Sequence, residues 1–309
     1  MTNLSEAGIL VSARPVMAVE EIRRMRGGCQ SHLMRCSDGQ YYVVKFQNNP
    51  QHRRVLVNEL LATRLAAWLG LPTTPAAVVQ VSEELIRLTY DLVMEMPRQR
   101  IPCQPGLQFG SRCFGSLRTA NTLNSLAYGY PFDPKQLSIF AGMLVFDKWT
   151  CNTDGRQVIF SITGIQPAYS MAMIDQGFCF NCGEWNFPDS PLRGLYADSS
   201  VYAEIKSLDD FEPWLSRLEG ELNLDTLSEA ASDIPPVWYD FDSDALSNLL
   251  KRLNHRRSLL RELLETACKA RPCVFSKWGD KQHNAVNSKY AKREYPQTGS
   301  AVRNVPELC

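Results

Sequence analysis

The sequence predicts an α+β fold in two lobes, a small β-rich N-lobe and a larger, mostly helical C-lobe. The chain has 309 residues, which exceeds one typical domain. Its first third alternates short apolar runs with turn signals, whereas the later part carries apolar residues at helical spacing. We expect an N-terminal extension over 1–15, an N-lobe over 16–97, a C-lobe over 98–270 and a disordered tail over 271–309.

Three predicted strands open the N-lobe, near Ala18–Arg23, His32–Cys36 and Tyr41–Gln47. Each is a short run in which apolar residues alternate with others. Gly27-Gly28 follows the first strand, and Asp38-Gly39 joins the second to the third. Because Asp-Gly between two apolar runs is a strong hairpin signal, we expect these strands to pair in sequence.

A lysine and a glutamate stand out in the next two elements. Lys45 is the one charge in the apolar run 41–46, and the strand period places it on a face with apolar neighbours, as in a cleft. Glu59 lies in the first turn of a predicted helix, Asn58–Leu71. The helix dipole alone favours a carboxylate there. We interpret Glu59 instead as the ion-pair partner of Lys45, which lies one loop upstream and faces the same way.

The remaining elements follow from the same signals. We expect strands at Val78–Val81 and Arg87–Glu95, and a hinge at Met94–Pro97 that brings Glu95 to a nucleotide. Residues 98–135 are rich in loop residues, with 105–115 as a flexible segment. The C-lobe is expected to contain a buried helix at Gln136–Trp149, strands at Val158–Ile162 and Ser170–Ile174, an irregular segment over 179–200, two short helical runs within Ile205–Leu227, and a long helix at Asp244–Ala270.

Two aspartates in the C-lobe border apolar elements. Asp154 lies in the polar turn 151–157 after the buried helix, and Asp175 ends the apolar run 171–177. Burying an isolated charge is costly unless the charge is paired or holds a metal. These two residues, with Lys45 and Glu59, therefore indicate a site.

The order of these four residues suits phosphoryl transfer. That reaction needs a lysine on the nucleotide phosphates, carboxylates that hold Mg²⁺, and a carboxylate that orients the attacking hydroxyl. Lys45, oriented by Glu59, suits the first role, Asp175 suits the metal because Mg²⁺ takes oxygen ligands, and Asp154 suits the third. The cofactors expected are ATP and Mg²⁺.

A glycine pair precedes the second strand. The run includes Gly27, Gly28, Gln30 and Ser31, and consecutive glycines let backbone N–H groups approach phosphates. An ordinary hairpin turn is the alternative interpretation. No GxxxxGK[ST] motif occurs, so a P-loop nucleotidase is not indicated.

The runs GGCQSHLMRCSDGQYYVVKF, NELLATRLAAWLGLP, NTDGR, MIDQG and IPPVWY occur in this order, and a leucine-rich helix follows. Together they resemble the HipA-like kinase family over roughly residues 16–268. Its best-known members are bacterial serine/threonine kinases of toxin–antitoxin systems, although members similar to this chain often stand alone. The resemblance implies a two-lobed kinase fold, ATP phosphates on Lys45, Asp154 as the catalytic aspartate and magnesium on Asp175.

One position departs from the kinase pattern. Such kinases carry an asparagine, a second metal ligand, about five residues after the catalytic aspartate, and Ile159 stands there. Gln157 and Asn152 are the candidate substitutes; we assign Gln157 as the metal ligand, although its spacing differs. Three hypotheses stay open: a kinase of protein serine or threonine, a nucleotide-binding pseudokinase scaffold, and a kinase of small molecules or lipids.

Composition limits the partners. Lys and Arg together number 33, as do Asp and Glu, which gives no strong nucleic-acid signal. We read no membrane span and no secretory signal, so we expect a cytoplasmic protein. The partners expected are ATP and a hydroxyl-bearing substrate, with a regulatory partner left open. The basic helical run 250–261 is typical of a solvated face; an anionic partner surface is the alternative.

The ten cysteines are expected to be reduced thiols. Cys179 and Cys182 form a C-x-x-C pair, but a structural zinc site needs a second pair of ligands that the sequence does not show. We interpret the pair as partly buried thiols that could tune the loop after Asp175.

Overall fold

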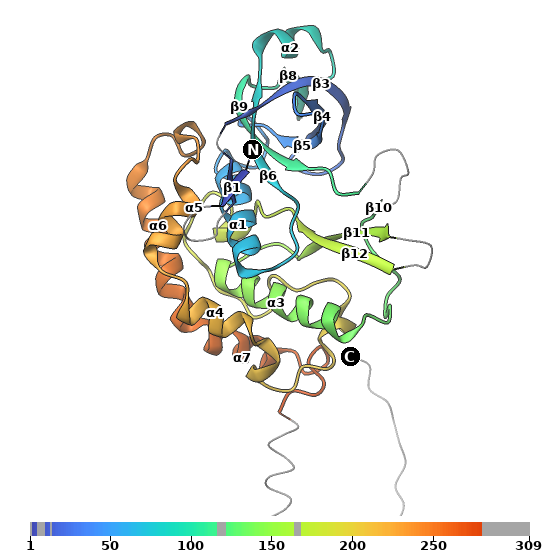
Figure 1. Ribbon diagram of the computed structural model, residues 1–309, viewed down its shortest axis with the longest axis vertical. Helices are drawn as coiled ribbons and strands as arrows, with labels where there is room; N and C mark the ends of the chain where they lie inside the picture. Colours follow the sequence, from blue (N-terminus) through green and yellow to red (C-terminus); the bar gives the residue numbers. More distant parts are fainter. Residues whose placement is uncertain (1, 5–9, 13, 116–121, 164–167, 280–309) are drawn as a thin grey trace, which may run out of the picture.

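The computed structural model describes residues 2–4, 10–12, 14–115, 122–163 and 168–279 (Figure 1). Its β-rich N-terminal region is followed by a mostly helical C-terminal region, so the fold is mixed α/β with the β structure concentrated near the start. Ahead of both, β1 (Thr2–Leu4) pairs antiparallel with β2 (Leu10–Ser12) inside the expected extension.

A closed five-stranded barrel forms most of the N-terminal region. Around the barrel the strand order is β3-β4-β5-β9-β6, antiparallel throughout except where β3 meets β6. Its interior is apolar, with Met34, Val44 and Val79 fully buried. The first three expected strands are confirmed. The strands are β3 (Val16–Arg24), β4 (His32–Cys36), β5 (Tyr41–Lys45), β6 (Ala76–Val81) and β9 (Gly106–Arg112).

The strand β9 corrects two expectations. Residues 105–115 were expected to be flexible, yet β9 lies between β5 and β6 in the barrel. Gly110, one of the glycines that suggested a loop, serves close packing instead, because a Cβ there would lie 2.4 Å from Val79 Cγ2. The chain therefore leaves the barrel after Arg112, and the barrel extends past the expected boundary at 97.

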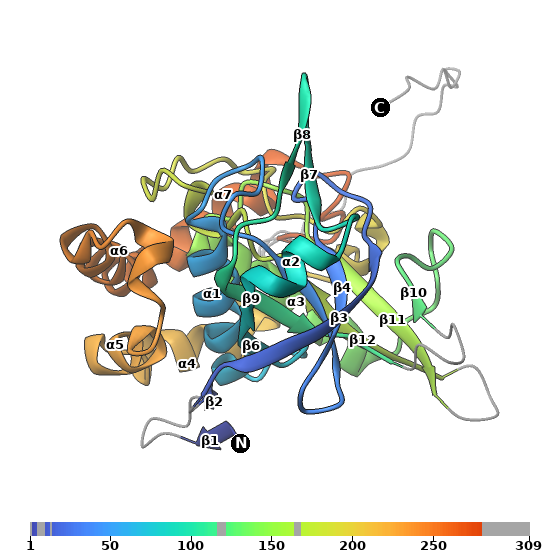
Figure 2. The ribbon, with the colours of Figure 1, turned by 90° about the horizontal axis from the view of Figure 1, so that it is seen from above.

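The expected hinge is also wrong. Residues 83–88 form α2 (Glu83–Leu88), whose first turn is capped by the Ser82 side chain. A hairpin of β7 (Val93–Met96) and β8 (Gln99–Pro102) follows and projects from the barrel (Figure 2). The Met94–Pro97 segment is thus a hairpin rather than a connection between regions, because the turn residues 97 and 98 reverse the chain.

The helix α1 (Val55–Leu69) lies between the barrel and the helical region (Figure 1). Nearly every residue is buried, which is typical of a helix covered on all sides. Its leucines pack into one cluster with α3 (Pro134–Thr150) rather than into the barrel interior. The helix ends at Gly70, where φ is 88°, as expected for a glycine C-cap.

The C-terminal region surrounds α3 with short elements. A sheet of order β10-β11-β12 contains the two expected strands. The long helix expected over 244–270 is two helices with a 3₁₀ turn at Arg257–Leu259 between them. The elements are β10 (Thr122–Leu123), β11 (Gln157–Thr163), β12 (Ala168–Ile174), α4 (Trp214–Gly220), α5 (Leu224–Ala231), α6 (Ser243–Arg256) and α7 (Leu260–Ala270).

The start of the expected tail is ordered. Val274 and Phe275 are buried, and the Phe275 ring lies 5.5 Å from that of Tyr202. Val274 and Phe275 are therefore part of the core, because their apolar side chains cover the helical region; residues 280–309 lie outside the described residues. None of the described helices combines the length and apolar character that a membrane crossing requires.

Candidate active site

The core of the site is an ion triad of Lys45, Glu59 and Asp175. Lys45 Nζ donates to Asp175 Oδ1 at 2.6 Å and also to Glu59 Oε1. The lysine is 7% exposed and the glutamate 2%, so both charges are held away from water. The triad joins β5, α1 and the end of β12, which are far apart in the sequence.

Electrostatics favour the charged forms of Lys45 and Asp175, whereas burial acts against the charge of Glu59. Burial alone would lower the pKa of Lys45, but the two carboxylates outweigh burial and raise it above its ordinary value. Burial would raise the pKa of Asp175, but the nearby ammonium holds it below its ordinary value. Burial raises the pKa of Glu59, an effect that Lys45 and the Gln176 N–H partly offset. That N–H donates to Glu59 Oε2 at 3.0 Å.

The β11–β12 hairpin brings the two predicted aspartates to one end. Gln157 pairs with Ile174, so Asp154, three residues before Gln157, and Asp175, one residue after Ile174, lie near the same hairpin end. Gln157 Nε2 donates to Asp175 Oδ2 at 3.1 Å. Asp154 is exposed, and its Oδ1 accepts only a short-range bond from the Gly155 N–H at 2.8 Å within the described residues. Its carboxylate is therefore accessible to a substrate.

Gln157 bears on the missing asparagine. Side chains alternate along a strand, so Ile159 shares a face with Gln157 but lies one step farther from Asp175. Gln157 is therefore the residue next to Asp175, although its spacing in the sequence had made its role as a second metal ligand doubtful.

A second, fully buried ion pair supports this hairpin end. Arg156 Nε donates to Asp147 Oδ2 at 2.8 Å, and a second guanidinium N–H bonds Oδ1, with both side chains 0% exposed. Asp147 also accepts from Asn152 Nδ2 at 3.0 Å, and Asn152 Oδ1 accepts the Asp154 N–H at 3.1 Å. The pair therefore supports the turn that presents Asp154.

The same guanidinium reaches the other aspartate. Arg156 Nη1 donates to Gln176 Oε1 at 2.8 Å and to the Ile174 carbonyl at 3.2 Å. These residues flank Asp175 on both sides. Sequence reasoning missed Asp147 and Arg156, although an aspartate inside the apolar helix 136–149 was a detectable signal.

Asn58 was also missed, because it was read only as a helix start. Its fully buried amide donates to the carbonyls of Gly177, Cys179 and Cys182 at 2.6–3.0 Å. Its oxygen accepts from Trp185 Nε1 at 2.9 Å. The residue next to Glu59 thus fixes the segment that follows Asp175.

The glycine-rich loop lies against the triad. Burial raises the pKa of the Cys29 thiol to about 12, and Lys45, Glu59 and Asp175 are all near enough to shift it electrostatically. The loop closes through a Gln30 N–H bond to the Gly27 carbonyl at 3.1 Å. Gly27 has φ of 131°, a conformation that favours glycine.

The other loop residues predicted to bind a nucleotide are placed as follows. A Cβ on Gly28 would point at the Gln51 side-chain amide, and Ser31, at the end of the loop, is buried. Gln30 points to the β7–β8 hairpin, where its amide bonds both the N–H and the carbonyl of Glu95 at 2.7 and 2.8 Å. The Glu95 side chain pairs with Arg24 and Arg100, each at 3.0 Å. Because the hairpin is not a hinge, the hinge-based role of Glu95 is not supported by this placement.

The C-x-x-C thiols lie after Asp175. Cys179 is fully buried, and burial raises its pKa to about 12. Cys182 is partly buried and its pKa is raised for the same reason. Thiols of this kind are not the reactive thiolate that a redox role requires.

A metal would have few protein ligands here. Among the described residues, no three His, Cys, Asp or Glu side chains gather as a ready-made metal site. Asp175 and Gln157 nonetheless fit Mg²⁺, which typically takes one or two carboxylates and completes its shell with water and substrate phosphates.

Three comparisons with known proteins bear on this site. Residues 18–168 match a family described as HipA-like kinase. A comparison with curated proteins found no match. Among solved structures, the Helicobacter pylori proinflammatory kinase CtkA is 14% identical and has a TM-score of 0.56, with 82% of this chain and 99% of that chain covered.

Two structures of the Golgi casein kinase are more distant. The first is 13% identical, with a TM-score of 0.45 and coverage of 81% of this chain and 73% of that one. The second, with Mn/ADP bound, is 10% identical, with a TM-score of 0.40 and coverage of 82% and 73%. The likeness to CtkA shows a shared fold, and the family match, which contains Lys45, Glu59 and Asp154, supports a phosphotransferase. Residues 18–168, just under half of the chain, are therefore similar to the HipA-like kinase family.

Proposed function

We propose that this chain is an ATP-dependent kinase that phosphorylates serine or threonine of a protein, with a two-lobed kinase arrangement. The observation that supports it most is the buried triad of Lys45, Glu59 and Asp175 beside an exposed Asp154. A buried charge cluster that ends in a partly exposed carboxylate is expected where a charged ligand enters.

Each residue has a proposed role. Lys45, oriented by Glu59, contacts the ATP phosphates, and the backbone of Gly27 and Gly28 covers them. Asp175 holds Mg²⁺ with Gln157, whose amide can turn its oxygen toward the ion. Bound Mg²⁺ would neutralise part of the phosphate charge. Asp154, exposed at the hairpin end, orients the attacking hydroxyl and accepts its proton.

The departure at Ile159 favours one second candidate, a pseudokinase scaffold that binds nucleotide without transferring phosphate. Only one carboxylate of the described hairpin end, Asp175, is in contact with Lys45; Ile159 stands at the position of the usual asparagine, and the amide beside Asp175 is that of Gln157. A kinase of small molecules or lipids is a third hypothesis that the same residues would serve.

The test combines Mg²⁺–ATP calorimetry with autophosphorylation from radiolabelled ATP. Wild type, Asp154→Ala and the matched control Asp244→Ala, an exposed aspartate on α6, are compared. We expect all three to bind ATP, and label to be lost in Asp154→Ala alone. Binding without label in wild type would favour the scaffold, or a kinase of another acceptor. No binding would overturn the roles of Lys45 and Asp175.

A further inference from the structure

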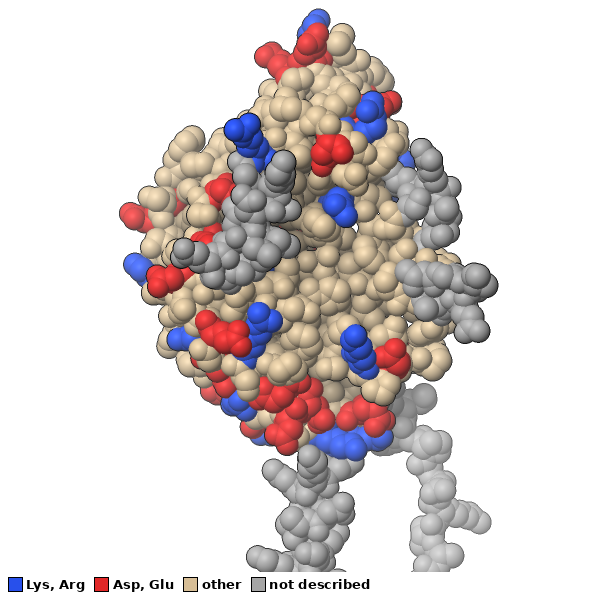
Figure 3. Space-filling view, viewed as in Figure 1, with Lys and Arg blue, Asp and Glu red and all other residues tan. Residues whose placement is uncertain are grey.

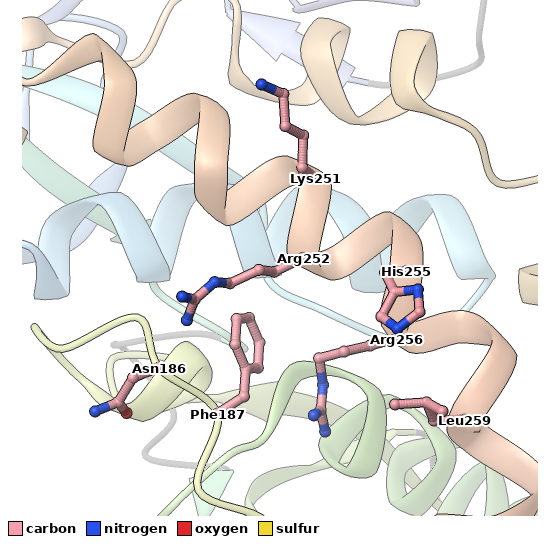
Figure 4. Close-up of a pocket in the computed structure, with 7 residues that line it drawn as sticks. All are labelled: Asn186, Phe187, Lys251, Arg252, His255, Arg256 and Leu259. Carbon is pink, nitrogen blue, oxygen red and sulfur yellow. The ribbon is translucent and has the colours of Figure 1, made fainter.

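A hollow of about 410 Å³ lies between α6 and the segment that follows Asp175 (Figure 4). Phe187 and Leu259 give it apolar surface. Lys251, Arg252 and His255 line it from exposed positions on α6, spaced so that they share one side of the helix. The opposite side of α6 is buried through Leu249, Leu250 and Leu253. We call this feature the α6 hollow.

The cations of the α6 hollow differ in how they are compensated. Arg256 is 6% exposed and forms a bidentate pair with Asp189 at 2.6 and 2.9 Å, so its charge is already matched. Within the described part of the chain, Lys251, Arg252 and His255 form no ion pair with a carboxylate. Two exposed cations, Lys251 and Arg252, and the His255 imidazole beside apolar surface are therefore left for an external anion.

Arg252 is the best placed of the three. Its Nη1 donates to the Trp185 carbonyl at 3.1 Å, which holds the side chain across the hollow, and Figure 4 shows Phe187 between Arg252 and Arg256. A guanidinium has five N–H donors in a planar fork, so donors remain for a carboxylate. Lys251 extends away from Phe187 in the same view, so it lines the edge of the hollow rather than its centre.

Helix stabilisation accounts for only part of this pattern. Cations in the last turn of a helix interact favourably with its dipole, which suits His255 and Arg256. Lys251 and Arg252 lie one turn earlier, where the dipole effect has fallen off. Their placement beside a hollow with an aromatic side chain needs another reason.

We propose that the α6 hollow docks an acidic polypeptide segment, with an apolar side chain against Phe187 and Leu259 and flanking carboxylates on Arg252, Lys251 and His255. Charge complementarity selects the occupant. A nucleic acid would need a longer basic track, whereas acidic and basic side chains are interspersed on the face in Figure 3 and the net charge is zero. The view that this segment belongs to the phosphoryl acceptor rests on the proposed function.

The chain links the α6 hollow to the candidate active site. Phe187 belongs to the segment whose earlier carbonyls are bound by Asn58. A few residues later, the Gly194 N–H bonds the Asp154 carbonyl at 3.2 Å and the Leu195 carbonyl accepts the Arg156 N–H at 3.0 Å. A docked acceptor would thus be held on the same segment that adjoins Asp154, which raises its effective concentration there.

The test measures peptide binding without ATP. The probe is a fluorescein-labelled peptide with a central leucine between pairs of Asp and Glu, and its neutral partner carries Asn and Gln at those positions. Fluorescence anisotropy is recorded for wild type, Arg252→Glu, Lys251→Glu and the control Arg271→Glu, an exposed arginine after α7. Arg252→Glu also removes the hydrogen bond to the Trp185 carbonyl and could weaken peptide binding by disturbing that segment. Lys251→Glu is the second variant that controls for this effect.

We expect wild type and Arg271→Glu to bind the acidic peptide alike, and both α6 variants to bind about tenfold more weakly or worse. Binding should also weaken as salt rises from 50 to 300 mM. Equal binding by Arg271→Glu and the α6 variants, or equal binding of the neutral peptide, would overturn the proposal. So would tighter binding of a single-stranded oligonucleotide that displaces the peptide.

Autophosphorylation separates this proposal from the proposed function. Lys251 lies outside the candidate active site, so Lys251→Glu should keep wild-type autophosphorylation and Mg²⁺–ATP binding. With a protein acceptor that carries the acidic sequence, it should raise KM and leave kcat unchanged. If the chain bound the peptide but transferred no phosphoryl group, the docking site would stand. The inference that its occupant belongs to the phosphoryl acceptor would be overturned.

Discussion

Two cation–carboxylate groups flank the end of the β11–β12 hairpin, and they differ in exposure. The Arg156–Asp147 pair is 0% exposed on both sides, and each partner is held by further hydrogen bonds. In the triad, the Asp175 side chain is 35% exposed, and Lys45 is shared between two carboxylates. The closed pair can only hold structure, whereas the open group can exchange a partner for a ligand. Burial, rather than residue type, separates scaffold from site.

The largest effect expected is on stability, from Asp147→Asn. The change leaves the buried Arg156 guanidinium without its counter-charge, and breaking one side of a buried pair costs about 3–5 kcal/mol. Urea unfolding followed by circular dichroism measures the loss. A decrease below about 1 kcal/mol would show that Gln176 and the Ile174 carbonyl compensate Arg156 without Asp147.

Asp175→Asn should lower activity strongly and stability only slightly, the reverse of what we expect for a change at Asp147. The amide keeps the shape but loses the charge that holds Mg²⁺, so autophosphorylation should fall by about 10²–10³-fold, the scale of losing one strong electrostatic contact in an active site. The unfolding midpoint should change little, because the side chain is partly solvated and Lys45 keeps Glu59. A variant that unfolds as easily as Asp147→Asn would erase the distinction between the two groups.

Asn58→Ala tests how the triad is connected to its segment. Three carbonyls and the Trp185 indole would lose their partner, and unsatisfied buried groups cost about 1–3 kcal/mol. Hydrogen exchange should become faster over 177–185 and stay unchanged in the barrel strands. Asn223→Ala, which removes a side-chain cap at α5, is the control for a general loss of stability. Equal exchange over 177–185 in both variants would contradict a local role.

The sequence was most informative where periodicity and charge agreed. Lys45, Glu59 and Asp175 could be predicted because each is a charge beside an apolar run, and the structure brings all three together. The strand β9 was misread as a flexible segment because Gly106 and Gly110 resemble loop residues, while the close approach of Val79 that requires Gly110 is a tertiary contact. Asn58 and Arg156 act through partners over a hundred residues and about twenty residues away, which no local pattern shows.

The smallest effect concerns Lys148, the neighbour of Asp147 on α3. Burial lowers its pKa to about 8, below the ordinary value of 10.5. Its ammonium donates to the carbonyls of Ser190, Pro191 and Arg193 at 2.7–3.1 Å, which holds the segment beyond the α6 hollow. Between pH 8 and 10.5 the unfolded chain binds this proton and the folded chain does not, so the free energy of unfolding should rise with pH in that window.

Lys148→Met isolates this slope. Its contribution is on the order of 1 kcal/mol per pH unit, and the buried cysteines, whose raised pKa values give the opposite slope above pH 9, are common to both proteins. The difference between wild type and Lys148→Met in urea unfolding at pH 7.5, 8.5 and 9.5 therefore reports Lys148 alone. A difference that stays constant across the three values would mean that the three carbonyls keep Lys148 charged, and that it belongs with Arg156 among the closed, structural cations.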